Sequence, residues 1–140
     1  MVKDDDYYEG LVMRVAGALH DDWRTDYVND PMNRYHDGTL KKKWGNIEKL
    51  TFDELPDEWK YENIAAARVV CDLVRRKNEG EILEYGTVGD AVHNAWLARN
   101  PLACAHPVYK KPFCELSPRE QLKDVNQYVI ALAIDDRTGA

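Results

Sequence analysis

Residues 106–124 constrain the fold of this chain more than any other stretch, because they specify an irregular segment followed by a helix start. Two prolines in the first half of the stretch disfavour helical geometry in the residues that precede them. Ser117 can then cap a helix with its hydroxyl group, Pro118 suits the first helical position, and Glu120 completes a capping box. The sequence therefore predicts an extended strap that leads directly into a helix.

The same pattern occurs a second time, earlier in the chain. Residues 52–64 align without a gap on residues 113–125, and both copies begin with the motif F-x-E-L. An H-x-x-W motif lies upstream of each copy, at residues 20–23 and again at residues 93–96. The order H-x-x-W, loop, F-x-E-L, helix thus appears twice, and this repetition predicts a duplicated structural unit.

Hydrophobic periodicity predicts an all-α fold with four main helices, at about residues 7–27, 57–77, 88–99 and 118–134. We expect these helices to form two pseudo-two-fold-related helix–strap–helix repeats with extended loops, at about residues 9–77 and 87–134. Residues 1–140 then make a single domain, in which residues 135–140 are a loose tail. The last helix is expected to bury four apolar side chains, namely Leu122, Val125, Val129 and Leu132.

Composition excludes several classes of protein. A formal net charge of −6 is unfavourable for a protein that binds nucleic acid polymers, which usually needs a basic face. No apolar run approaches the length of about 18 residues that a membrane span requires. The three cysteines, Cys71, Cys104 and Cys114, form no C-x-x-C motif, and no signal peptide is visible. We therefore expect reduced thiols and a cytoplasmic location, with no membrane partner.

The H-x-x-W motifs and the proline-containing stretch around F-x-E-L resemble the ryanodine-receptor repeat domain, called the RyR domain. That module occurs in tandem in the animal calcium-release channel and as a single unit in bacterial and phage proteins, and this chain resembles a stand-alone prokaryotic or phage-type member. The resemblance implies a soluble small-molecule sensing module. It also implies nucleotide binding, as in the channel's tandem repeat, or recognition of nucleotide-derived signals in bacterial or phage defence. The chain departs from the family in lacking a G-W-x-Y-G element after Trp96, whereas residues 43–45 resemble part of it.

A pseudo-two-fold arrangement would place Trp23 and Trp96 at equivalent positions. Two indole rings that face each other across the cleft between the repeats could stack on both faces of a planar base, whereas the alternative is that both are core residues. His20 and His93 would hydrogen-bond or position the rings. The remaining candidate ligand-binding residues are Tyr109 and, as phosphate contacts, Lys43 with its neighbours Lys41 and Lys42, Arg99, Lys110 and Lys111.

Catalysis is the less favoured interpretation. The histidines lack the i, i+4 spacing of a helical zinc site, so we expect no metal and no cofactor. The E-x-x-E pair at residues 81–84 has no E-x-x-D partner on a helix, and Cys114 is the only candidate nucleophile. We expect a non-enzymatic protein that binds a small nucleotide-like ligand for sensing or sequestration. The alternatives are a protein-interaction adaptor with an aromatic groove and a metal-dependent nucleotide hydrolase, and the sequence leaves open a homo-oligomer or an unidentified protein partner.

Overall fold

The computed structural model of the protein describes residues 2–139, apart from the side chains of residues 103 and 104. This part of the chain is all-α, as predicted, and its four long helices are α1 (Asp5–Asn29), α2 (Asp57–Asn78), α3 (Tyr85–Arg99) and α4 (Pro118–Thr138). Between them lie short 3-10 turns, which are η1 (Pro31–Asn33), η2 (Ile47–Lys49), η3 (Phe52–Glu54), η4 (Pro101–Ala105) and η5 (Phe113–Glu115). The predicted thiol state of Cys104 lies outside the described side chains.

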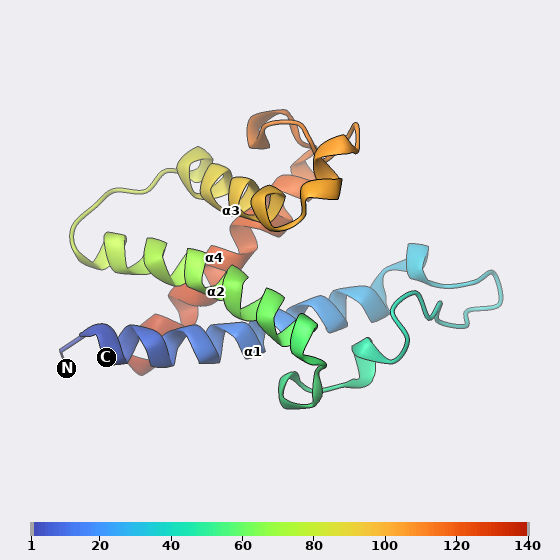
Figure 1. The fold of residues 1–140 in the computed structure, drawn as a ribbon, viewed down its shortest axis with the longest axis horizontal. Coiled ribbons are helices and arrows are strands. Elements are labelled where there is room, and N and C mark those ends of the chain that lie inside the picture. Colours follow the sequence, from blue (N-terminus) through green and yellow to red (C-terminus); the bar gives the residue numbers. More distant parts are fainter. Residues whose placement is uncertain (1, 140) are drawn as a thin grey trace.

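The helices pack in an arrangement that brings both chain ends to one side of the molecule. Helices α1, α2 and α4 contact one another, and α3 packs against α2 and α4 (Figure 1). The irregular segments that follow α1 and α3 extend toward the side opposite the two termini (Figure 1). The F-x-E-L motifs lie at the ends of these segments, in η3 and η5, whereas the H-x-x-W motifs lie inside α1 and α3.

The core forms where the apolar stripes of the helices meet. Leu11 and Val15 of α1 and Val70 and Val74 of α2 are almost fully buried, at the helical spacing expected of inward-facing positions. Ala131 of α4 is also fully buried. Except for Leu11, these positions carry β-branched valine or the small alanine, so the core between the three helices is built mainly from compact side chains.

Three of the predictions about helix limits and buried faces were wrong. Helix α3 begins at Tyr85, three residues before the predicted start, because the chain turns into the helix immediately after a short loop. The predicted loose tail is instead the end of α4, which continues to Thr138. Leu122 and Val129 are 60% and 51% exposed, because α4 presents a different face, with Tyr128, Ala131 and Ile134, to the core.

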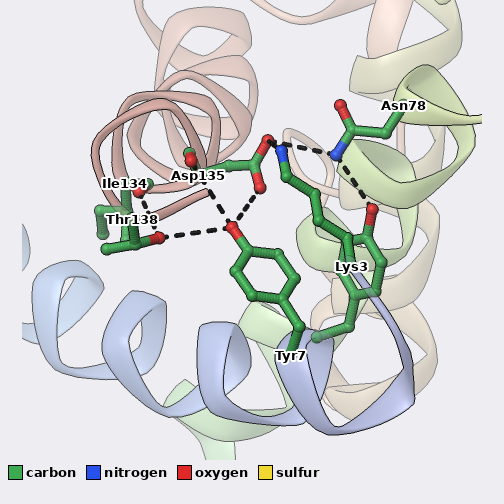
Figure 2. A network of polar contacts seen from close by, with 7 residues as sticks. Lys3, Tyr7, Asn78, Ile134, Asp135 and Thr138 are labelled. Carbon is green, nitrogen blue, oxygen red and sulfur yellow. Dashed lines mark hydrogen bonds and ion pairs between the residues drawn. The ribbon is translucent and has the colours of Figure 1, made fainter. Parts of the chain in front are cut away.

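A buried carboxylate explains why the end of α4 is ordered. Asp135 is 1% exposed and accepts hydrogen bonds from Tyr7 Oη (2.5 Å), Lys3 Nζ (3.1 Å) and Asn78 Nδ2 (3.2 Å), as Figure 2 shows. Burial by itself raises the pKa of this carboxyl group, but the hydrogen bonds from Tyr7, Asn78 and Lys3 outweigh burial and lower the pKa below its usual range. The network joins the start of α1 and the end of α2 to the last turns of α4.

Candidate functional site

His20 connects α1 to the segment that precedes α2. Its ring is 1% exposed, and Nε2 lies 2.8 Å from the carbonyl oxygen of Leu50. Because a carbonyl oxygen can only accept, Nε2 must carry the hydrogen and donate it. The same oxygen also accepts a hydrogen bond of 2.6 Å from Arg24 Nη1. We call residues 50–55, which begin at this carbonyl group and end before α2, the first strap.

His93 makes the same connection in the second half of the chain. Its ring is 3% exposed, and Nε2 donates to the carbonyl oxygen of Lys111 at 2.8 Å. Residues 111–116 form the second strap. Leu50 and Lys111 each lie two residues before the phenylalanine of F-x-E-L, so the two histidines bind equivalent carbonyl groups. The shared contact supports a duplicated local unit, while the two-fold relation between the repeats stays a prediction.

Each strap contains a short 3-10 turn where the sequence predicts an extended chain. The turns at Phe52–Glu54 and Phe113–Glu115 place the leucine that follows each of them, Leu55 or Leu116, in a buried position. The hydroxyl group of Ser117 accepts a hydrogen bond from the backbone amide of Glu120, so the predicted cap of α4 is confirmed. The turns shorten the straps and direct the chain into α2 and α4.

Trp23 belongs to a row of aromatic rings on the first repeat. The indole is half-buried, and its centroid lies 5.3 Å from that of Tyr27 and 5.4 Å from that of Trp59. Trp59 in turn packs edge-on against Trp44, with centroids 5.8 Å apart. Trp44 is 54% exposed, so the row begins inside the protein and ends at its surface. Trp44 and Trp59 were not predicted as site residues, although the presence of two further tryptophans was a signal.

Trp96 has its own aromatic surroundings on the second repeat. The indole is half-buried, and the ring of Tyr109 packs edge-on against it with centroids 5.5 Å apart. The ring of His106 lies 4.6 Å from that of Tyr109. In the part of the chain that the structure describes, no ring contact joins Trp96 to Trp23. A clamp of both indoles on one ligand therefore stays a prediction.

The predicted phosphate contacts differ in how strongly the protein already engages them. The Arg99 guanidinium group forms a forked ion pair with Glu62 at 3.1–3.2 Å, which leaves it poorly suited to a ligand. Lys43 donates to the side-chain oxygen of Asn33 at 3.1 Å and remains exposed. Lys110 and Lys111 are exposed beside Tyr109. The lysines are therefore better candidates for phosphate binding than Arg99.

Basic side chains gather on a small hairpin next to the first aromatic row. An isolated bridge joins Arg34 to Leu40, and Gly38 has a φ angle of 90°, which favours glycine in the turn. The run Lys41–Lys43 follows the bridge directly and precedes Trp44. The hydroxyl group of Tyr27 donates to the carbonyl oxygen of Lys41 and so holds this run against the end of α1.

One buried carboxylate has no partner among the described side chains. Glu48 in η2 is 5% exposed, and neither of its carboxylate oxygens has a hydrogen-bond partner. It lines a cavity of about 290 Å³ with Arg24, Thr25, Val28 and Asn29. A second cavity, of about 370 Å³, lies between the ends of α1 and α4, and neither cavity includes Trp23 or Trp96. The burial of Glu48 could not be predicted from the sequence, because a single glutamate in an irregular segment is usually exposed to solvent.

Asp124 faces the ring of His93 from α4. Its Oδ2 lies 3.6 Å from His93 Nδ1, and its side chain is 17% exposed. Burial raises the pKa of Asp124 to about 6; Glu120 also raises the pKa, while His93 and Lys123 act in the opposite direction. The pattern that placed His93 on a helix gave no sign of this pair, because Asp124 lies 31 residues further on and reaches the histidine only through the fold.

The described cysteines differ in exposure. Cys71 is buried in the core, and burial raises the pKa of its thiol to about 12, which disfavours the reactive thiolate. Cys114 is exposed in the second strap. Within the described residues, no group of three His, Cys, Asp or Glu side chains is placed to hold a metal ion.

Comparisons with protein-family models, with curated proteins and with solved structures gave no match to this chain. Within residues 2–139, each helix is too short or too polar to cross a lipid bilayer.

Proposed function

We propose that this protein binds a small nucleotide-like ligand without catalysing a reaction. The observation that carries the proposal is the construction of the two H-x-x-W units. In each unit a buried histidine fixes a strap on a helix, and a half-buried tryptophan lies beside further aromatic rings. Exposed lysines adjoin one of these aromatic residues in the sequence. Planar rings suit the base of such a ligand and lysines suit its phosphates, so each unit supplies both kinds of contact.

The first unit supports the proposal through its aromatic row and its basic hairpin. Trp44 offers more than half of its surface to solvent, and Lys41–Lys43 precede it directly. The second unit supports it through Trp96 and Tyr109, which Lys110 and Lys111 follow in the chain. Together with the sequence resemblance to stand-alone RyR domains, these features lead us to propose that this protein has a cytoplasmic role in sensing or sequestering a nucleotide-derived signal.

Intrinsic fluorescence and calorimetry with adenosine monophosphate and adenosine triphosphate test this function. Trp23→Ala and Trp96→Ala should each weaken binding by about 1–3 kcal/mol, since stacked bases lose this amount when an aromatic partner is removed. If both indoles hold one ligand, the double variant should not show the sum of the two losses. Affinity for the triphosphate should fall as salt rises, because salt screens the lysines.

Tyr61→Ala is the matched control, because Tyr61 is 73% exposed on α2 and lies outside both aromatic clusters. Binding that both tryptophan variants leave unchanged would contradict the assignment of Trp23 and Trp96. The absence of any fluorescence or heat signal with either nucleotide would contradict adenine nucleotide binding.

A further inference from the structure

A cavity beside the end of α1 adjoins the buried carboxylate of Glu48. This side chain is 5% exposed, and among the described residues neither of its carboxylate oxygens has a hydrogen-bond partner. Such a group is costly to bury, because it has lost its contacts with water and has gained no donor in exchange. The cavity of about 290 Å³ next to it has room for a group that supplies the missing donors.

The other residues that line the cavity belong to the last turns of α1. They are Arg24, Thr25, Val28 and Asn29. Their spacing places them on one face of the helix, and η2, which carries Glu48, packs against α1. Thr25 and Asn29 are exposed whereas Glu48 is buried, so the cavity is open to solvent and has the carboxylate at its inner end.

The second repeat differs from the first in the segments that form this cavity. Helix α1 continues to Asn29, six residues past the tryptophan of its H-x-x-W motif, whereas α3 ends three residues past its own tryptophan. Four residues before the phenylalanine of F-x-E-L, the second repeat has Tyr109 in place of Glu48. The cavity is therefore separate from the contact between histidine and strap that both repeats share.

Arg24 lines the same cavity without neutralising Glu48. Its Nη1 donates to the carbonyl oxygen of Leu50 at 2.6 Å and lies 3.8 Å from Oδ1 of Asp21. Within the part of the chain that the structure describes, no ion pair joins Arg24 to Glu48. The positive charge of Arg24 thus has two acceptors beside it, whereas the described residues give the negative charge of Glu48 no counter-ion.

We propose that this cavity binds a small organic cation, an ammonium group on a short alkyl chain, with Glu48 as its counter-ion. An ammonium group has three donors, and Thr25 and Asn29 offer side-chain oxygen acceptors in addition to the carboxylate. Val28 supplies apolar surface for the alkyl chain. A calcium ion fits less well, because it takes several oxygen ligands and Glu48 is the only carboxylate among the described lining residues.

Calorimetry with butylammonium chloride at pH 7 tests the site. This amine has the same charged end as a lysine side chain and is protonated at that pH. 1-Butanol has the same chain without the charge, and sodium butyrate carries the opposite charge. The cation should bind at least about tenfold more tightly than either of them, because a hydrogen bond between charged groups is stronger than one that involves a neutral group.

Substitution of Glu48 tests its role as the counter-ion. Glu48→Gln keeps the size of the side chain but removes its charge, and should weaken butylammonium binding about 10- to 100-fold. Glu48→Met, whose folding does not depend on a buried polar group, should also lose binding. Glu58→Gln is the matched control, because Glu58 is exposed in the first turn of α2, and it should bind butylammonium as the natural protein does.

Arg24→Gln distinguishes a cationic ligand from an anionic one. It removes a like charge from the cavity and should not weaken butylammonium binding, while His20 still donates to the Leu50 carbonyl group. Tighter binding of butyrate than of butylammonium, lost in Arg24→Gln, would overturn the proposal. Calcium chloride that binds in competition with butylammonium and requires Glu48 would show a metal site instead.

Amide NMR locates the bound cation. Shifts on addition of butylammonium should centre on residues 24–29 and 46–50. Binding that Glu48→Gln leaves unchanged would overturn the proposal, and so would equal binding of 1-butanol. An absence of both heat and amide shifts would show that water alone occupies the cavity, which also overturns it. Neither Trp23 nor Trp96 lines this cavity, so these results are independent of the nucleotide experiments.

Discussion

The two H-x-x-W units of this protein make the same backbone contact in different surroundings. His20 and His93 donate to the carbonyl groups of Leu50 and Lys111 at the same distance of 2.8 Å, two residues before a phenylalanine. The surroundings differ in that Phe113 is 2% exposed whereas Phe52 is only partly buried. The two units thus share the histidine–carbonyl contact, while the packing and charges around it differ.

The comparison separates the backbone contact that the two units share from the side chains in which they differ. In both units a buried histidine satisfies the carbonyl group at the start of the strap, which would otherwise lack this donor. The positions around this contact are less restricted. In the gapless alignment Trp59, which extends the first aromatic row, corresponds to Glu120. Four residues before the phenylalanine of each motif, outside that alignment, stand the buried Glu48 and Tyr109, which lies beside Trp96.

Replacements of the phenylalanines should give the largest effects. Phe113→Ala removes an almost fully buried ring and should lower the free energy of unfolding by about 3–5 kcal/mol. Phe52→Ala should cost about 1–3 kcal/mol, because part of the Phe52 side chain is already exposed to solvent. Urea unfolding of both variants measures the difference, and equal losses would show that the straps are packed alike.

The glycines opposite these rings should give effects of opposite sign. A Cβ atom on Gly89 would lie 2.1 Å from the ring of Phe113, so Gly89→Ala should destabilise the protein by about 1–3 kcal/mol. A Cβ atom on Gly17 would meet Phe52 at 3.9 Å, an ordinary contact, so Gly17→Ala should stabilise α1 by about 0.5–1 kcal/mol. Thermal unfolding tests both, and a stabilising Gly89→Ala would contradict the close packing of the second strap.

The histidines should differ because their carbonyl partners differ. His93→Ala leaves the Lys111 carbonyl group without its histidine donor and should cost about 1–3 kcal/mol. His20→Ala should cost about 1 kcal/mol less, because Arg24 still donates to Leu50. The exposed His36 provides a control whose replacement by alanine should change the free energy of unfolding by less than about 0.5 kcal/mol. In a protein that already carries Arg24→Ala, His20→Ala should cost as much free energy of unfolding as His93→Ala does, because no second donor then remains for the Leu50 carbonyl group.

Replacements of Glu48 and Tyr109 should give the smallest effects. Glu48→Met replaces an unpaired buried carboxylate with an apolar side chain of similar size and should stabilise the protein by about 1 kcal/mol. Tyr109→Ala should change the free energy of unfolding by about 0.5 kcal/mol or less, since Tyr109 is 36% exposed. A destabilising Glu48→Met, measured by urea unfolding at pH 7, would show that the Glu48 carboxylate has a stabilising partner.

Local sequence rules were sufficient for the all-α fold and for most helix limits. The apolar stripes of α1 and α2, the cap at Ser117 and the two H-x-x-W motifs act over a few residues, so they could be identified from spacing alone. The prediction of a loose tail was wrong, because the adjacent acidic residues Asp135 and Asp136 are typical of a solvent-exposed chain end. Only the donors from Lys3, Tyr7 and Asn78 make burial of Asp135 favourable.

The sequence by itself therefore determined where helices form and which residues recur in the two repeats. The tertiary structure decided which side chains meet, because such contacts depend on how distant helices cross. The partners of His93, which are the Lys111 carbonyl group and Asp124, lie 18 and 31 residues away in the chain. No helical or strand periodicity extends across an irregular loop, so the different surroundings of the two H-x-x-W units could be recognised only from the folded chain.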